Sequence, residues 1–327
     1  MKIYYVLGSM SDLADPESKI LQSVRQEFLL FPTVEEATSL DSADVILIQE
    51  KVSFKNFRYI NELLADPLIA KYYHKIFTIN SDDCATGLLR GAYTSLPKSR
   101  FNPKLYTPVP YFDYPNELVF SKTQKEVLPT YLACWRGNTK SNKIRPVMAK
   151  ALHGMSEVRI EMTDSWLDHL FKEKQTYVDL MLQSKFSLCP AGWAPVSFRI
   201  YESMALGRCP VIIADNFVPP AGPNWKDFAL FLPEREMSTL YSSILQHEHS
   251  YKELGEQALQ AWNGFFCPDK ITRFYAQSLF SLISYTSASS KEAELKRWRS
   301  SDLYWNNKWT LSQRIVNKAR RIFDKTI

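Results

Sequence analysis

The chain has 327 residues, of which 45% are apolar and 23% charged, a composition typical of a folded globular protein with about two domains. Its net charge of +5 is too small to indicate nucleic-acid binding, and the sequence contains no recognised nucleic-acid-binding motif. We therefore expect no nucleic-acid partner. The five cysteines show no CxxC spacing, which argues against a disulfide framework and a zinc site. Only 10 glycines occur, which argues against glycine-rich phosphate loops.

Short apolar runs alternate with helical patterns in the first third of the chain. Residues 2–7, 45–49 and 75–80 are predicted strands, with helices at 17–30 and 56–73 between them. Strands that alternate with helices indicate βαβ units and a parallel sheet. A polar cluster follows each predicted strand, at the end where open α/β sheets bind their ligands.

A proline-rich stretch and a second α/β series follow. Five prolines within 97–118 predict a long surface loop without regular structure, leading to a boundary at 120–127. Beyond it we expect strands at 129–135, 157–162, 185–189, 209–214 and 228–232, and helices at 142–153, 173–183, 197–206, 236–263 and 268–288. We therefore predict an α/β protein with two Rossmann-like domains that face each other across a cleft.

The domain limits that we predict are 1–125 and 126–290, followed by a basic helical segment at 291–327. No window approaches 18 apolar residues, and the first apolar run is too short for a signal peptide, so we expect a cytoplasmic protein. Residues 308–325 form a basic amphipathic pattern. They are predicted either to pack on the N-terminal domain or to contact an anionic membrane surface. We favour the second alternative, in which the protein is peripheral on the inner face of the membrane.

One segment carries the strongest chemical signal. A predicted buried strand leads into a Pro-Ala-Gly-Trp-Ala-Pro loop, and a helix begins near Ser197, a residue type favoured as an N-cap. Arg199 and Glu202 are three positions apart and share a helix face. An arginine fork beside a helix N-terminus suits a diphosphate, and the glutamate could accept hydrogen bonds from ribose hydroxyls. The simpler interpretation is an exposed ion pair on a helix surface.

Three neighbouring residues admit a structural or a functional interpretation. Trp193 could stack on a base or a sugar, or pack against the loop prolines. Cys189 and Cys209 flank the segment beside apolar residues, and we expect both in the core.

The segment from 192 to 236 resembles the signature of exostosin-like glycosyltransferases, glycosyltransferase family 47, and is closest to their short microbial members. An upstream element, TYLACWRGNTKSNKIR, resembles the Arg-Gly-Asn…Ile-Arg element of the family. The matched positions in the main segment are Gly192, Ser197, Phe198, Arg199, Glu202, Ala205, Leu206, Gly207, Pro210, Val211, Ile212, Asp215, Pro220, Trp225, Phe228, Pro233 and Glu234.

The resemblance implies a GT-B architecture and inverting transfer from a nucleoside-diphosphate sugar, usually UDP-linked, held by the C-terminal domain. No Asp-x-Asp motif occurs, so we expect neither a metal nor another cofactor. Arg136, Arg199 and the helix N-terminus would then neutralise the leaving diphosphate. The residues expected to bind the sugar donor are Arg136, Gly137, Asn138, Arg145, Gly192, Trp193, Ser197, Phe198, Arg199 and Glu202.

An inverting transferase also needs a general base, which this architecture places in the N-terminal domain. We predict Asp83, with Asp82 as the second choice; the alternative is that one of them caps the following segment. Asp12 and Glu50 follow other predicted strands at equivalent positions and stay open. His74 precedes its strand and is expected to be structural.

The predicted function is assembly of a surface polysaccharide or glycoconjugate, with a glycan or a lipid-linked acceptor. The alternative is a non-catalytic subunit that binds nucleotide sugars or serves as a scaffold in an assembly complex.

Overall fold

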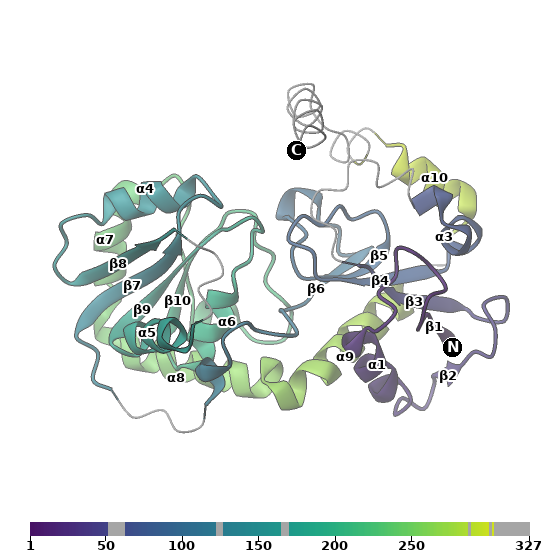
Figure 1. Cartoon of the computed structure of the whole chain (residues 1–327), viewed down its shortest axis with the longest axis horizontal. Coiled ribbons are helices and arrows are strands. Elements are labelled where there is room, and N and C mark those ends of the chain that lie inside the picture. The colour runs from purple at the N-terminus through teal and green to yellow at the C-terminus, as the bar shows by residue number, and fades with distance from the viewer. Residues whose placement is uncertain (52–62, 122–126, 165–169, 287–288, 301–302, 304–327) are drawn as a thin grey trace. The chain divides into compact units, whose positions relative to one another are not determined.

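The structure is a computed structural model that describes residues 1–51, 63–121, 127–164, 170–286, 289–300 and 303 (Figure 1). The chain divides into two compact units. The first holds Met1–Ala92, Asn102–Tyr106 and the described residues from Leu279 onward; the second holds Tyr93–Phe101 and Thr107–Ser278.

The first unit is built on a sheet with strand order β2-β1-β3-β4-β5-β6. The β1–β2, β1–β3 and β3–β4 pairs are parallel. This confirms the parallel sheet predicted for the first third of the chain. The strands span β1 Lys2–Tyr5, β2 Glu35–Glu36, β3 Val45–Gln49, β4 Ile76–Asn80, β5 Arg90–Tyr93 and β6 Tyr106–Pro108.

Local sequence explains the main elements of this unit. Every residue of β3 is buried, as expected for a central parallel strand covered on both faces. Helix α1 (Lys19–Phe28) begins after Ser18, whose hydroxyl accepts a hydrogen bond from the Leu21 amide at 2.8 Å. Helix α3 (Pro67–Tyr72) is capped in the same way by Asp66 and has proline in its first position, where no amide hydrogen is needed.

The second unit has a five-stranded sheet with order β11-β10-β9-β7-β8, in which every neighbouring pair is parallel. Its strands span β7 Tyr131–Asn138, β8 Val158–Thr163, β9 Ser184–Pro190, β10 Cys209–Ile213 and β11 Leu230–Phe231. Its helices are α4 Ile144–Ala151, α5 Phe171–Leu182, α6 Phe198–Ala205, α7 Leu240–Leu245 and α8 Tyr251–Ala261, with shorter turns at η1 Lys98–Arg100, η2 Glu117–Phe120, η3 Trp225–Asp227, η4 Met237–Thr239 and η5 Glu248–Ser250.

Helices cover both faces of this sheet, with α4 and α7 on one face and α5, α6 and α8 on the other (Figure 1). Side chains alternate along a strand, so β7 serves both layers. Cys134 belongs to the same buried core cluster as Val178 and Met181 of α5. Trp135 faces the opposite layer, where the Arg145 guanidinium of α4 lies 5.9 Å from its ring centroid. The two α/β units confirm the predicted pair of Rossmann-like domains.

The boundary between the units differs from the predicted limit at residue 125. The proline-rich segment is not a structureless surface loop: it contains β6 and the turns η1 and η2, so that prediction was wrong. Val109 and Tyr111 are buried, and the Tyr111 ring stacks on Phe198 with centroids 3.8 Å apart. Rings and proline side chains supply packing surface without needing a regular backbone, which brings most of this segment into the second unit.

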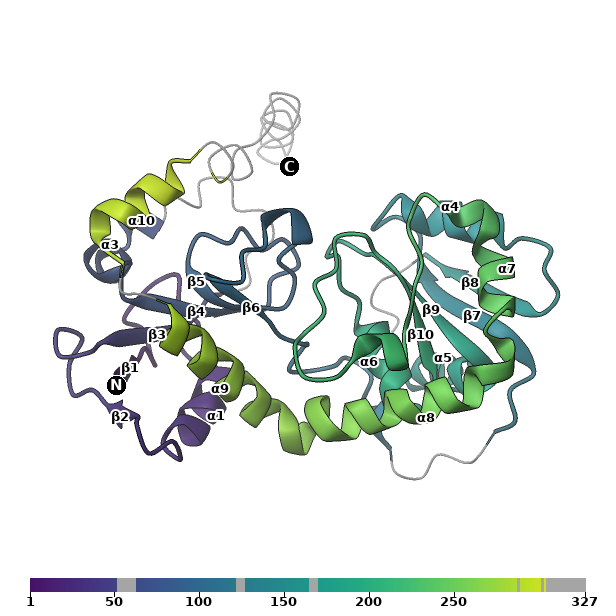
Figure 2. The ribbon, with the colours of Figure 1, turned by 180° about the vertical axis from the view of Figure 1, so that it is seen from behind.

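The C-terminal part of the chain is also divided differently from the predicted limits 126–290 and 291–327. Helix α9 (Pro268–Tyr285) follows α8 through a π-helical turn, η6 (Trp262–Phe266), and its last turns belong to the first unit (Figure 2). Helix α10 (Lys291–Trp298) packs on the first unit, where the buried Trp298 indole donates to the Leu88 carbonyl at 2.8 Å. The predicted membrane-contact segment 308–325 lies outside the described residues.

Close packing of α8 against the end of α6 depends on glycine at 255. A Cβ atom there would lie 2.3 Å from the carbonyl oxygen of Gly207. We expect Gly255→Ala to lower the free energy of unfolding by about 1–3 kcal/mol, because the added methyl forces the helices apart. Gly264→Ala is the matched control, since its Cβ would meet nothing within 4 Å. Equal urea denaturation midpoints for the two variants would contradict this packing.

Candidate functional site

The second unit has a topological switch point between β7 and β9. The chain leaves β7 towards β8 on one side, while β9 lies on the other side of β7. The loops that follow β7 and β9 therefore diverge, and open α/β sheets bind ligands at the carboxyl ends of strands at such a point. The sugar-donor residues predicted from the sequence lie at the end of β7, in the loop after β9, and on the helices α4 and α6 that follow these strands.

Arg145 of α4 joins the two loops. Its Nε donates to the Ala191 carbonyl after β9, and its Nη1 donates to the Asn138 carbonyl at the end of β7, both at 2.9 Å. Gly192 allows this approach, because a Cβ atom there would lie 2.8 Å from Arg145 Nη2. The arginine therefore fixes the spacing of the loops at the switch point.

Helix α6 begins where the sequence predicted. The Ser197 hydroxyl accepts a hydrogen bond from the Arg199 amide at 3.3 Å, which confirms Ser197 as the N-cap. Gly207, which follows the helix, adopts a φ of 63°, as expected for a residue that ends a helix. The N-terminal end of α6 thus carries the partial positive charge of a helix dipole.

The guanidinium of Arg199 is buried, with 8% of the residue exposed. Its Nη2 donates to the Arg136 carbonyl of β7, and the guanidinium carbon lies 4.8 Å from the centroid of the Tyr177 ring in α5. Nη1 is also buried and has no hydrogen-bond partner among the described residues. A buried charged donor without a partner is costly, and an acceptor such as a water molecule or an anion would satisfy it.

Glu202 is even more buried, with 3% exposed. One carboxylate oxygen accepts a hydrogen bond from the Tyr177 hydroxyl. Burial raises the pKa of the Glu202 carboxyl, and the Tyr177 hydroxyl and the Arg199 guanidinium partly offset this effect. Arg199 and Glu202 do share a helix face, as predicted, because both meet Tyr177. The interpretation of the two as an exposed ion pair was wrong.

Tyr177 was not identified from the sequence. It lies on α5, 25 residues before Glu202, and contacts both Arg199 and Glu202. Nothing in the local sequence marks it, because its role arises only when α5 and α6 pack together on the same face of the sheet.

The other predicted residues on β7 have protein partners. The Arg136 guanidinium forms ion pairs with Glu161 of β8, at 2.6 Å, and with Glu173 of α5. Its charge is therefore compensated within the protein. The Asn138 side chain bridges the ends of β7 and β8 by donating to the Asp164 carbonyl at 2.9 Å. Gly137 lies beside Arg199: a Cβ atom there would be 3.6 Å from its Nη2.

The remaining predicted residues of this segment differ in exposure. Trp193 is 38% exposed, in the loop between β9 and α6. The Phe198 ring is occupied by stacking on Tyr111. Cys189 and Cys209 are fully buried, which confirms the prediction that they belong to the core.

The predicted base residues lie in the first unit, directly after β4. The Asp82 carboxylate accepts the Cys84 amide at 2.8 Å, and the Asp82 carbonyl accepts the Ala85 amide at 3.2 Å. Asp82 therefore caps the turn that follows the strand, which was one of the two roles predicted for this pair. Asp83 is half-buried at the next position.

Glu50, at the carboxyl end of β3, is the most perturbed acid of the first unit. It is 3% exposed, and its Oε1 has no hydrogen-bond partner among the described residues. Burial raises the pKa of Glu50 to about 7, although Thr78 and Asn80 act in the opposite direction; the charge of Asp82 raises it further. Glu50 therefore exchanges a proton near neutral pH.

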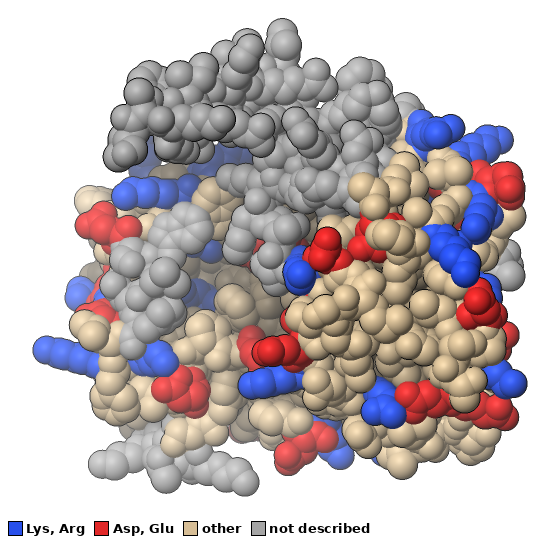
Figure 3. Space-filling view, turned by 45° about the vertical axis from the view of Figure 1, so that its right-hand side comes forward, with Lys and Arg blue, Asp and Glu red and all other residues tan. Residues whose placement is uncertain are grey.

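Within the described residues, no three His, Cys, Asp or Glu side chains gather as a metal site would require. No described helix combines the length and apolar character needed to cross a bilayer. On the face shown in Figure 3, the described Lys and Arg side chains lie among Asp and Glu side chains.

We expect Glu50 to make stability fall as pH rises. Its pKa in the folded protein, about 7, exceeds the usual 4.5, so the folded state holds this proton more tightly than the unfolded state does. The resulting stabilisation is complete below pH 4.5 and is lost as pH rises through 7, to a total of about 3 kcal/mol. Urea denaturation at pH 5 and pH 8 should show a smaller pH effect in Glu50→Gln than in the unmodified chain. The same pH effect in both would contradict this assignment.

Comparison with known proteins adds sequence relatives. The family model of the exostosin GT47 domain matches residues 71–247. In Arabidopsis thaliana, the probable glucuronoxylan glucuronosyltransferase IRX7 is 47% identical over 73 residues, which are 22% of this chain and 16% of that protein. In Oryza sativa subsp. japonica, the probable glucuronosyltransferase GUT1 is 41% identical over 88 residues, 25% of this chain and 20% of that protein. The matched segments thus span a fifth or less of these relatives.

Solved structures are more distant. Anabaena HepE in complex with UDP shares 11% identity, with 87% of this chain and all of that chain aligned at a TM-score of 0.41. TarM shares 9% identity over 64% of this chain and 55% of that chain, with a TM-score of 0.39. The family match is the stronger finding, since it covers more than half of the chain and includes β7, β9, α6 and the switch point between them. The chain belongs to the exostosin GT47 domain family.

Proposed function

We propose that this protein is an inverting glycosyltransferase that takes a sugar from a nucleoside diphosphate, UDP first among them, without a metal ion. The acceptor would be a glycan or a lipid-linked saccharide in the synthesis of a surface polysaccharide or glycoconjugate. The observation that carries the proposal is the buried Arg199 guanidinium beside the start of α6 at the switch point, whose Nη1 has no partner in the part of the chain that the structure describes.

The chemistry of a leaving diphosphate matches this site. Breaking the bond to the sugar concentrates negative charge on the diphosphate, and a fixed cation in a water-poor site stabilises that charge strongly. Arg199 would provide the cation through Nη1, while its other contacts keep the guanidinium in place. Arg136 already has two carboxylate partners, so we assign the larger share of this task to Arg199.

Glu202 is proposed to bind the donor nucleotide from the same helix face. A ribose hydroxyl could take the second carboxylate oxygen while Tyr177 keeps the first. The names of the two plant relatives make UDP-glucuronate the first sugar donor to test.

We expect Arg199→Met to weaken UDP binding by about 10- to 100-fold, because a charge-assisted hydrogen bond to phosphate is lost. Calorimetric titration with UDP measures this directly. Arg208→Met is the matched control: Arg208 is a half-buried arginine before β10 whose Nη2 donates to the Leu182 carbonyl, away from the switch point. UDP affinity that survives in Arg199→Met, or that falls equally in both variants, would refute the proposal.

Asp83 is the proposed general base. Asp83→Asn should slow transfer by about 10²- to 10⁴-fold and leave UDP binding unchanged, because the base acts on the acceptor and not on the nucleotide. Asp82→Asn is the matched control, since asparagine can cap the same turn. Initial rates of sugar transfer decide between them. Full activity in Asp83→Asn, with loss in Glu50→Gln, would move the role of base to Glu50.

The same experiments separate an enzyme from a non-catalytic subunit. A transferase turns over the sugar donor that it binds, and an inverting one gives a product with the opposite anomeric configuration to the donor. UDP binding without turnover of any sugar donor, even with a glycan or lipid-linked acceptor supplied, would favour the scaffold alternative.

A further inference from the structure

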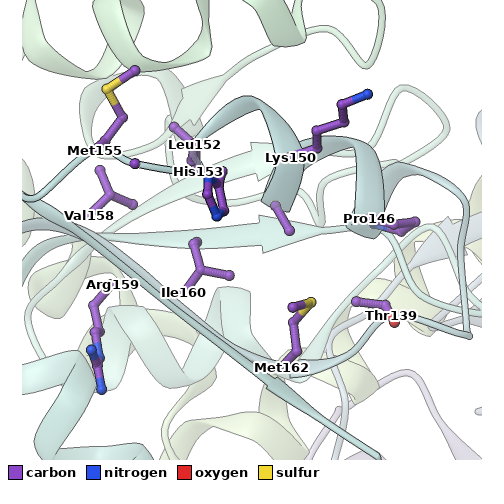
Figure 4. Close-up of a pocket in the computed structure, with 12 residues that line it drawn as sticks. Thr139, Pro146, Lys150, Leu152, His153, Met155, Val158, Arg159, Ile160 and Met162 are labelled. Atoms are coloured by element: carbon purple, nitrogen blue, oxygen red, sulfur yellow. The ribbon is translucent and has the colours of Figure 1, made fainter.

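A groove of about 500 Å³ lies between α4 and the edge strand β8 of the second unit (Figure 4). Its floor is a row of apolar side chains on one face of β8, namely Val158, Ile160 and Met162. Pro146, Ala149 and His153 form the wall on the side of α4. Met162 is 68% exposed, although moving a methionine side chain out of water is energetically favourable.

The exposed face of α4 continues this apolar surface. Lys143 and Lys150 are seven positions apart, on the same side of the helix, with Val147 between them. Both lysines are exposed, Val147 is 49% exposed, and Lys150 also lines the groove. We name the surface made of Lys143, Val147, Lys150 and the groove the α4–β8 patch.

The segment that carries α4 has charges of one sign. Residues 139–156 contain Lys140, Lys143, Arg145 and Lys150 and no aspartate or glutamate. The acids that follow are largely engaged: Glu157 accepts the Tyr241 hydroxyl, and Glu161 pairs with Arg136 and with Arg159, the latter at 3.0 Å. Asp164 is exposed beyond the end of β8. An exposed apolar groove with lysines beside it is complementary to an anionic group that carries an apolar chain.

We propose that the α4–β8 patch binds anionic phospholipid at a bilayer surface. An acyl chain would lie along Val158, Ile160 and Met162, and Lys143 and Lys150 would contact lipid phosphates. An apolar groove alone would suit a second copy of the chain equally well. The cationic, acid-free face of α4 favours the lipid, because two copies would bring like charges together.

The proposed contact would hold the second unit at the membrane. The groove reaches Thr139, the first residue after β7, so the end of the groove at Thr139 lies next to the switch point. A sugar-donor site next to a lipid surface suits a lipid-linked acceptor. The lipid contact goes beyond the proposed function and does not depend on it, because vesicle binding requires no nucleotide.

Vesicle co-sedimentation of the full chain tests the proposal. We compare vesicles of phosphatidylcholine alone with vesicles that also contain phosphatidylglycerol. Lys143→Glu/Lys150→Glu should lower partition onto the anionic vesicles by about tenfold or more, since each basic side chain near the surface contributes measurably. Lys226→Glu/Lys252→Glu is the matched control: it makes the same change in net charge at two exposed lysines of the second unit outside the patch.

A second pair of variants tests the groove itself. Met162→Asp should reduce anionic-vesicle binding, and Met162→Leu should retain it. The thermal unfolding midpoint of each variant confirms that it is folded. Unchanged binding in Met162→Asp and in the patch lysine variant overturns the proposal, as does equal binding of the unmodified chain to phosphatidylcholine vesicles. Loss of self-association without loss of vesicle binding in Met162→Asp would assign the groove to a second copy, and also overturns it.

Discussion

A buried guanidinium needs partners within the protein, and Arg199 of α6 takes its partners from two other elements. The Arg136 carbonyl belongs to β7, Tyr177 to α5, and the arginine itself to the first turn of α6. Taking such a charge out of water is tolerated only where geometry is favourable, so these contacts fix how α5 and α6 lie on the sheet. Nη1 is buried and has no hydrogen-bond partner among the described residues.

The surrounding fold holds helix α6, and with it the Arg199 guanidinium, in place. The aromatic side chains of the proline-rich segment cover the outside of α6, where Tyr111 stacks on Phe198 and Tyr114 lies against Tyr201. Arg145 holds the loops after β7 and β9 at a fixed spacing. The few glycines near the site serve close approach and not a phosphate loop: Gly137 lies beside Arg199, and Gly192 lies beside Arg145. In a chain poor in glycine, the proposed diphosphate site thus consists of an arginine and one helix end.

Elements that carry their own local signal could be predicted from the sequence. The strand at 45–49 is an unbroken apolar run, and the α6 helix has a serine at its start and a glycine after its end. Elements without such a signal were missed. Strand β2 consists of two glutamates, and β5 holds an arginine and a glycine, so both depend on their neighbours in the sheet. The buried Arg90 of β5 forms an ion pair at 3.9 Å with Glu294 of α10, about 200 positions later, which no local pattern reveals.

The same distinction applies to the site. Family resemblance and helix spacing identified Arg199 and Glu202, but their burial and the part played by Tyr177 come from packing between helices. The partners of Arg199 include a backbone carbonyl, which no residue type reveals. Asp82 was weighed as a base or a cap, and only the hydrogen bond from Cys84 gives it a capping role.

A crystal structure of the protein with UDP tests the central claim most directly. The account predicts a diphosphate at the carboxyl ends of β7 and β9, with a phosphate oxygen within hydrogen-bond distance of Arg199 Nη1. UDP bound elsewhere, with Arg199 still buried and unpartnered, would contradict it.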